Sequence, residues 1–447
     1  MIPMSVDFTM YPDRLQPHIV MKDLNEPIEV AKGPFRLTGD VEGRLEADLV
    51  VRWVPSLEIA FDGNYSGPTI GFSTEQLTLA SDGALPFSVP VNLTRVGLGM
   101  DSQSVRGTIA GKIVTGRGAC KSLRFGLVNF PEFIGDPVRV RRGESDGWSR
   151  SRLECLADIG VCRIDEIEEV AELRKHAIRD AGAVVSHVGQ WVPRAAMVSP
   201  DESDEVVRLL HFWFGFLRGA WTGPVFVEGV GERDEIVWRQ FARWKLSETR
   251  EMPGWFPERT PTDLSPLFSG FTARWNDPAW NRPLIAAISW LVEANSSRSA
   301  LESRIVLAQV ALDLLAWVHV VETQRLHSRA DFKRLSAAGR IRALLHHIRV
   351  PTEVPDHLAN LTPLQRNEAF DGPGVITSVR NSLVHATEDN RARTANLAGL
   401  QLLECSHLGL QYLELAILSI CGHSGHYARR GWRGWKGEDE VLVPWAG

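Results

Sequence analysis

Cysteine is scarce in this chain of 447 residues, which contains only five. The five are scattered along the sequence: Cys120, Cys155, Cys162, Cys405 and Cys421. A disulfide framework in a small secreted domain uses an even set of closely spaced cysteines, and this chain has neither property. We therefore expect free thiols in a reducing compartment.

The chain also lacks a secretory leader and a long apolar run. Its first residues, MIPMSVDFTMYPDRLQPH, contain no charged start followed by an apolar core. The most apolar stretch, residues 408–421, is interrupted by Glu414 and is too short to cross a bilayer. A formal net charge of −6 excludes a global positive field, so any nucleic-acid site must be local. We expect a cytoplasmic protein without membrane association.

Motifs for nucleotides, metals and acyl transfer are missing too. The stretch GRGACKS has Cys120 where a phosphate loop needs glycine, and no Gly-x-Ser-x-Gly motif occurs. CGHSGH places Cys421, His423 and His426 close together, but the spacing fits no standard zinc pattern. A helix that ends at Gly422 explains this stretch better, so no metal and no cofactor is expected.

The patterns that are present predict an α+β multidomain protein. Residues 1–148 are β-rich, with short alternating runs between turn residues, and predict a sandwich or barrel-like region. Residues 149–278 are mixed α/β, and include a buried helix at 201–219 and an irregular linker around 250–268. Residues 279–425 carry five segments with helical periodicity, which predicts a bundle, and 426–447 form a basic and aromatic tail.

Glu302 has two interpretations. It stands three residues after Ser299 at the start of a predicted helix, which is the spacing of a capping box. The cap suffices to explain the residue, and a supporting carboxylate at a catalytic site is the alternative.

Two basic segments are candidates for contacting RNA. RIRALLHHIR contains Arg342, His346 and His347, and is either a solvated helix face or the wall of an anion-binding groove. RRGWRGWK contains Arg430 and Arg433 between tryptophans that can stack on bases. An ordered tail that packs its tryptophans onto the bundle explains the second segment equally well.

The stretch SVRNSLVHA at 378–386 is the strongest candidate for chemistry. On a helix Asn381 and His385 share a face, and the long side chain of Arg380 can reach the same place if the helix ends nearby. Histidine can transfer protons near neutral pH, arginine can stabilise charge on a phosphate, and asparagine can orient either.

RNSLVH, preceded by four amphipathic helices and followed by a long one, resembles the signature of the HEPN superfamily. The resemblance covers roughly residues 280–425 and implies an all-α HEPN helical bundle with metal-independent endoribonuclease activity. It implies that Arg380 and His385 form the catalytic pair, that Asn381 supports them, and that two copies join as a homodimer. The layout, with VLVPWAG at the end, is similar to ApeA-like anti-phage proteins, which implies an RNA substrate and a phage-derived trigger at the N-terminal region.

The alternative is a non-catalytic scaffold. In that interpretation the tryptophan-rich β region recognises a ligand or nucleic acid, and the helical bundle only dimerises. The burial and ionic partners of Arg380 and His385 distinguish the two.

Overall fold

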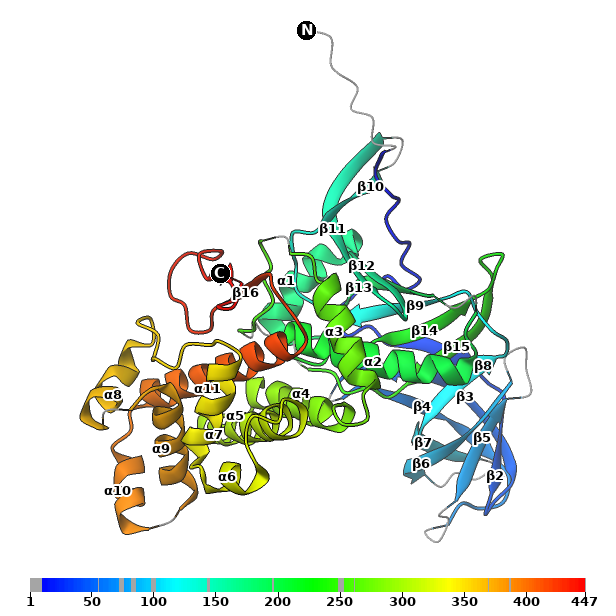
Figure 1. Ribbon diagram of the computed structural model, residues 1–447. Helices are drawn as coiled ribbons and strands as arrows, with labels where there is room; N and C mark the ends of the chain where they lie inside the picture. Colours follow the sequence, from blue (N-terminus) through cyan, green and yellow to red (C-terminus); the bar gives the residue numbers. More distant parts are fainter. Residues whose placement is uncertain are drawn as a thin grey trace.

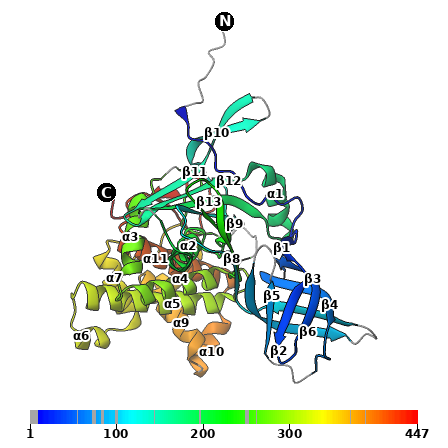
Figure 2. The same ribbon diagram turned by 90° about the vertical axis from the view of Figure 1, so that its right-hand side faces the viewer.

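The computed structural model describes residues 10–446 except 55, 72–75, 82–85, 98–101, 143–144, 195–196, 248–252, 261, 369 and 386. The described chain forms a β-barrel, a central antiparallel sheet with two helices, and a C-terminal helical region (Figures 1 and 2). The predicted α+β multidomain class is confirmed.

The N-terminal barrel is a closed antiparallel sheet. Its seven strands lie in the order β1-β3-β2-β5-β6-β7-β4, and β3 also pairs with β4, so that β2 to β7 close a six-stranded ring while β1 pairs only with β3. Side chains alternate between the barrel interior and solvent, as in β6, because successive residues of a strand face opposite sides. The strands are β1 (Ile28–Lys32), β2 (Phe35–Gly39), β3 (Gly43–Arg52), β4 (Glu58–Ser66), β5 (Leu77–Ser81), β6 (Phe87–Gly97) and β7 (Gln103–Ile109).

The central sheet has eight strands in the order β10-β11-β12-β13-β9-β14-β15-β8. Strands of the β-rich region expected at residues 1–148 are thus divided between the barrel and this sheet. The boundary expected at residue 148 falls inside β11. The strands are β8 (Lys112–Gly116), β9 (Ser122–Val128), β10 (Asp136–Arg142), β11 (Ser145–Ala157), β12 (Gly160–Glu166), β13 (Val185–Pro193), β14 (Val225–Val230) and β15 (Ile236–Ala242).

Two helices accompany the central sheet. The first, α1 (Ala171–Asp180), follows a short 3-10 turn, η2 (Glu168–Val170). The second, α2 (Pro200–Arg218), starts with a capping box between Ser199 and Glu202 and ends at Gly219, whose φ is +68°. Most of its C-terminal half is buried, which confirms the predicted buried helix.

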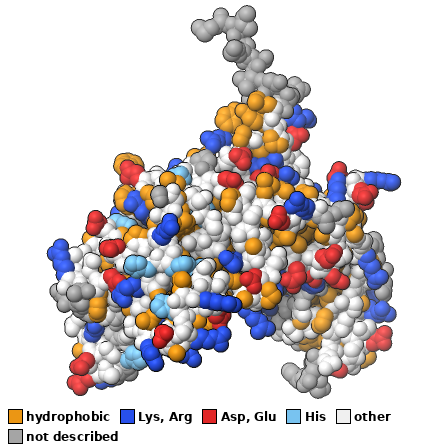
Figure 3. Space-filling model, in the orientation of Figure 1, with side chains coloured by type: hydrophobic (Ala, Val, Ile, Leu, Met, Phe, Trp, Pro, Cys, Tyr) orange, Lys and Arg blue, Asp and Glu red, His pale blue; other side chains and the backbone are white. Residues whose placement is uncertain are grey.

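The two faces of the central sheet pack into different cores. Leu123, Phe125 and Leu127 of β9 belong to the core that contains α2 and the C-terminal helices. Val185 and Val188 of β13 belong to the core that contains the barrel. The sheet is therefore the middle layer between the barrel and the helices. The barrel and the helical region are two lobes of the surface, with an indentation between them (Figure 3).

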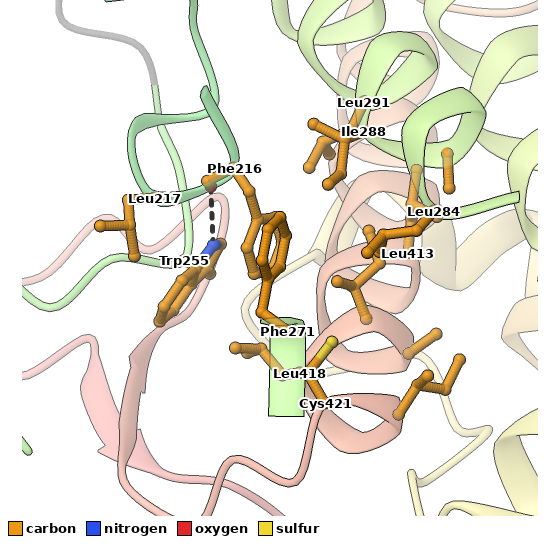
Figure 4. Close-up of a cluster of buried hydrophobic side chains, with 14 of the residues drawn as sticks. Phe216, Leu217, Trp255, Phe271, Leu284, Ile288, Leu291, Leu413, Leu418 and Cys421 are labelled. Atoms are coloured by element: carbon orange, nitrogen blue, oxygen red, sulfur yellow. Dashed lines mark hydrogen bonds between the residues drawn. The ribbon is translucent and has the colours of Figure 1, made fainter. Parts of the chain in front are cut away.

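The stretch around 250–268 was predicted to be an irregular linker, and its described residues are irregular up to α3 (Ser265–Asn276), with a buried centre at residues 255–257. The Trp255 ring is fully buried, and its Nε1–H donates to the Phe216 carbonyl oxygen over 2.9 Å (Figure 4). Because Trp255 lies between α2 and the end of the chain's last long helix, this segment joins the central region to the helices.

The helical region contains all five predicted segments and several shorter helices. Its elements are α4 (Asn281–Asn295), α5 (Leu301–Ala316), a π-helical turn η3 (Trp317–Thr323), α6 (Arg329–Arg334), α7 (Ala337–His347), η4 (Ala359–Leu361), α8 (Thr362–Glu368), α9 (Gly372–Val384), α10 (Glu388–Ala395) and α11 (Gly399–Ile420). A hairpin of β16 (His426–Ala428) and β17 (Glu440–Leu442) follows.

One helix is long and apolar enough to cross a membrane by length and composition. It spans Leu301–Thr323, and its most apolar window has a mean hydropathy of 1.8 and is 61% buried inside the fold. A core helix of a folded domain has the same properties, so this is weak evidence for a membrane span.

Helices α5, α9 and α11 meet at Gly409. A Cβ added there would lie 3.2 Å from the Cβ of Ala308 and 3.9 Å from the Cδ1 of Ile376. Near the start of α9, a Cβ on Gly372 would touch the hydroxyl of Tyr412. The contacts run in opposite directions along the two helices, so α9 is antiparallel to α11 and its C-terminal end lies beside the start of α11.

Candidate functional site

The start of α9 is fixed by a carboxylate. Asp371 is the N-cap, and its Oδ1 accepts from the Gly374 N–H over 3.0 Å. The Arg342 guanidinium donates to both oxygens of the same carboxylate, over 2.7 and 2.8 Å. Asp371 is partly buried, which raises its pKa, but Arg342 and the capping N–H overcome this effect and leave the pKa below its usual value. The anion therefore stays charged at the helix start, where the helix dipole favours it.

The end of α9 carries the predicted catalytic residues. The helix stops at Val384, and His385 is its C-cap, with φ −103° and ψ 106°. The His385 N–H closes the helix on the Asn381 carbonyl over 3.0 Å, and its side chain is exposed. The sequence placed His385 one turn after Asn381 in a helix that ends nearby; in the structure it is the C-cap itself, the first residue of the short link to α10.

Arg380 and Asn381 are half-buried and bonded to each other. Arg380 Nη1 donates to Asn381 Oδ1 over 3.2 Å. Within the described residues neither Arg380 nor His385 has a carboxylate partner. Arg380 is therefore not neutralised by a structural ion pair, which is the condition for an arginine that stabilises charge on a substrate.

Two polar atoms on this side of α9 are enclosed without a hydrogen-bond partner among the described residues. They are Arg380 Nε and Thr377 Oγ1, three residues apart and so on one helix face. A buried donor without a partner costs about 1–3 kcal/mol, and native proteins retain few of them. These two polar atoms therefore destabilise the folded state, although both are retained on this face of α9.

The turn after His385 starts α10. Thr387 is its N-cap, and its Oγ1 accepts from the Asn390 N–H over 3.3 Å. Thr394 on α10 donates to the Ser382 carbonyl over 3.0 Å, which fixes α10 against α9. His385 therefore lies in a short, well-anchored connection between two helices.

Glu302 is exposed in the first turn of α5, and the predicted capping box does not form. The N-cap is Ala300, and the Ser299 hydroxyl donates instead to the Glu293 carbonyl over 2.7 Å. The helix begins later than the sequence suggested because Ser299 ties off the preceding helix. Ala308 of α5 and Ile376 of α9 both face Gly409, whereas Asp313, later in α5, pairs with Arg340 on the turn of α7 that also holds Asp371, at the start of α9. The two helices are therefore antiparallel, and α5 starts on the side of the bundle where α9 ends.

The basic segment of α7 lies at the other end of α9. Arg342 pairs with Asp371, and from there to His385 the chain covers about 20 Å of helix at 1.5 Å per residue. His346 and His347 are exposed, and the His347 ring lies 5.0 Å from that of His319. Within one protomer these three residues therefore do not share a site with Arg380 and His385. The importance of Asp371 was missed, although an Asp before Gly-Pro is a recognisable helix start.

Arg430 is not on the surface, which corrects the prediction that it contacts RNA. Its side chain is fully buried and donates to both carboxylate oxygens of Glu414, each over 2.6 Å, and to Asn295 Oδ1 over 2.8 Å. A guanidinium enclosed in this way cannot reach a ligand. Burial raises the pKa of Glu414 more than Arg430 lowers it.

In the rest of the tail, some residues pack onto the helical region and others are exposed, so the packing interpretation applies to part of this segment and RNA contact stays a prediction for the other part. Trp432 packs under Arg429, whose guanidinium lies 4.1 Å from the ring centre, and beside His357. Trp435 is 82% exposed. Arg433 remains largely exposed while it donates to the buried carboxylate of Glu404 over 3.1 Å. The tail is thus an ordered part of the helical region that presents one tryptophan and one arginine to solvent.

Helix α11 ends just before Gly422, as the sequence predicted for the CGHSGH stretch. Gly422 has a φ of +76°, and its N–H donates to the Ser419 carbonyl over 3.0 Å. His423 is buried and its Nε2 lies 3.0 Å from the His426 carbonyl oxygen. In the part of the chain that the structure describes, no group of His, Cys, Asp or Glu is arranged to hold a metal ion.

Comparison with known proteins gives two family matches. Residues 277–440 match the YopA C-terminal domain, and residues 116–252 match the YopA central domain. These ranges correspond to the helical region and to most of the central sheet. The chain is also similar to the SPbeta prophage-derived uncharacterized protein YopA of Bacillus subtilis (strain 168), with 24% identity over 435 residues, 95% of this chain and 96% of the relative. No solved structure matches.

Proposed function

We propose that the helical region is a HEPN-type, metal-independent endoribonuclease in which Arg380 and His385 carry out the cleavage. The observation that carries the proposal is the state of these residues at the end of α9. His385 is exposed beside the link to α10, and Arg380 has no carboxylate partner among the described residues. An exposed imidazole, five residues after an arginine that no carboxylate of the described chain neutralises, provides the minimum pair of groups for phosphodiester transfer.

The reaction would use the ribose 2′-hydroxyl as nucleophile, the group that distinguishes RNA from DNA. The 2′-oxygen attacks phosphorus, the bond to the 5′-oxygen breaks, and the products are a 2′,3′-cyclic phosphate and a 5′-hydroxyl. His385 takes the proton from the 2′-hydroxyl or delivers one to the leaving 5′-oxygen. Arg380 stabilises the charge that builds up on the phosphate oxygens, and Asn381 holds the guanidinium in place.

A homodimer would complete the site. Proton removal and proton delivery need two groups, and one protomer offers a single histidine there. Val384 and Leu400 are 42% and 51% exposed and lie at the same end of the bundle, since α9 ends where α11 begins. Exposed apolar side chains beside His385 favour an isologous contact through this end.

In the cell we place the protein in the cytoplasm, as an anti-phage enzyme of the abortive-infection type. The barrel and central sheet would detect a phage-derived trigger and the helical region would respond. Glu302, at the same end of the bundle, supports the site electrostatically, and Arg433, His346 and His347 are the remaining exposed candidates for RNA contact.

Induced expression tests the proposal in cells. Wild type, Arg380→Ala and His385→Ala are expressed at equal levels, with and without phage, and growth and total RNA integrity are followed. We expect growth arrest or RNA fragmentation in the wild type and neither in the two variants. Identical behaviour of all three proteins under both conditions would contradict the proposal and favour the non-catalytic scaffold.

A further inference from the structure

A cavity of about 560 Å³ lies where the barrel, the central sheet and the helical region meet. Its lining comes from four segments: residues 56–57 of the barrel, 219–221 after α2, 243–247 after β15, and 292–298 at the end of α4. Its volume is within the range of small-molecule sites, which also occur preferentially between domains. In Figure 3 the surface is indented between the helical region and the barrel, and Lys and Arg side chains gather beside the indentation.

One wall of the cavity is aromatic and held rigidly. Trp221 and Ser247 are joined by two hydrogen bonds of 2.9 Å, from the Trp221 N–H to Ser247 Oγ and from the Ser247 N–H to the Trp221 carbonyl. The Trp221 ring stacks on His211 at 4.5 Å and 7°, and the Trp244 ring lies 4.8 Å from the same imidazole. Burial lowers the pKa of His211 to about 4, so this ring is neutral at pH 7.

The charge of the lining is positive. Arg243, Lys245 and Arg298 line the cavity, against a single carboxylate, that of Glu293. Arg243 and Lys245 are exposed, and neither forms an ion pair with another described residue. In a chain with a net charge of −6, such a local excess of cations in a concave site attracts anions.

The cavity is connected to the centre of the helical region. Asn295, in its lining, donates from Nδ2 to the Gly219 carbonyl over 3.0 Å and accepts from Arg430 over 2.8 Å. A Cβ on Gly219 would lie 2.7 Å from that Nδ2, so glycine is required for this contact. Arg430 in turn holds Glu414 of α11. A buried polar chain therefore leads from the cavity to the helix that α9 packs against.

We propose that this cavity binds a nucleotide, with the phosphates at Arg243 and Lys245 and the base against the wall formed by Trp221 and Trp244. Phosphate groups and an aromatic base are the two chemistries that this lining offers together. A nucleotide bound here would contact all three regions and so fix their arrangement. Control of RNA cleavage by this nucleotide rests on the proposed ribonuclease function, whereas nucleotide binding does not depend on it.

Calorimetric titration of the full chain tests the proposal with three probes: ATP, adenosine and tripolyphosphate. ATP should bind in the micromolar range, and adenosine and tripolyphosphate at least about tenfold more weakly, because each lacks one of the two recognised parts. Tripolyphosphate that binds as tightly as ATP, or no heat from ATP up to about 1 mM, would overturn the proposal.

Matched variants locate the site. Arg243→Gln/Lys245→Gln should weaken ATP binding at least about tenfold, and both residues are exposed, so folding is maintained. Arg194→Gln/Arg334→Gln removes the same charge from exposed positions elsewhere and should bind ATP like the wild type. Equal affinity of the two double variants would refute the site. Arg380→Ala should bind ATP normally, so failure of the ribonuclease proposal and failure of this one are separately visible.

Discussion

Arg430 offers the sharpest test of how the tail is attached to the helical region. Arg430→Met keeps much of the side-chain volume but removes the charge that compensates Glu414. Both side chains are essentially inaccessible, with exposures of 0% and 1%. Breaking a buried ion pair by removing one partner costs about 3–5 kcal/mol, because the remaining charge stays in a low-dielectric interior.

Urea unfolding, followed by circular dichroism at a helix-sensitive wavelength, measures this loss. With a slope of about 1–3 kcal/mol per molar urea, a loss of about 3–5 kcal/mol should shift the transition of the helical region down by about 1–5 M. Arg430→Met/Glu414→Leu should recover most of the loss, since a buried pair replaced by apolar groups is often close to neutral. Arg194→Met, which removes an exposed partner of Asp158, should shift stability by less than about 0.5 kcal/mol. A midpoint for Arg430→Met equal to that of Arg194→Met would refute the burial and the pairing described here.

Three further outcomes are expected. Arg342→Gln should lower the free energy of unfolding by about 1 kcal/mol and reduce RNA cleavage without changing RNA affinity, because Arg342 positions α9. Urea unfolding and RNA-binding assays measure the two effects. A loss of RNA affinity at unchanged stability would instead show that Arg342 contacts RNA. His319 is buried, which lowers its pKa from 6.5 to about 4. As the pH falls from about 6.5 to 4, the unfolded state therefore binds a proton that the folded state does not, and the free energy of unfolding decreases by at most about 3 kcal/mol. His319→Phe should flatten this part of the stability profile measured between pH 7 and pH 4, and an unchanged profile would contradict the burial of His319. Gly270→Ala should lower the free energy of unfolding by more than about 2 kcal/mol, because the new Cβ would lie 1.9 Å from a backbone oxygen at the end of α11. In the control variant Gly399→Ala the new Cβ has no atom within 4 Å, so the same unfolding assay should show a neutral or stabilising effect.

The helices were predictable because their signal is local. The apolar spacing in α4, α5 and α11, and the Gly219 that ends α2, are visible in short windows of sequence. Strands were recognisable as strands, but not their partners. β9 pairs with β13 and β14, which come much later in the chain, so its assignment to the central sheet depends on long-range pairing that alternation does not encode.

The errors at single residues have the same origin. RRGWRGWK is a basic surface tail by composition, and only Glu414, sixteen residues earlier and buried, makes Arg430 a core residue. Ser299 and Glu302 have capping-box spacing, but the carbonyl of Glu293 competes for the serine hydroxyl. The junction cavity was missed because its four lining segments are far apart in sequence, although the RWK stretch that contains Trp244 and Lys245 alternates cation and aromatic after a strand.

The most direct test of the central claim is RNA cleavage by purified full-length protein in the presence of EDTA. A labelled single-stranded RNA is compared with the same sequence in DNA, with wild type, Arg380→Ala, His385→Ala and the exposed-surface control Arg334→Ala. We predict cleavage of RNA alone, to 2′,3′-cyclic phosphate ends, by the wild type and Arg334→Ala, and at least about a hundredfold slower cleavage by the other two variants. Cleavage of RNA by Arg380→Ala and His385→Ala at the wild-type rate would contradict the proposed function.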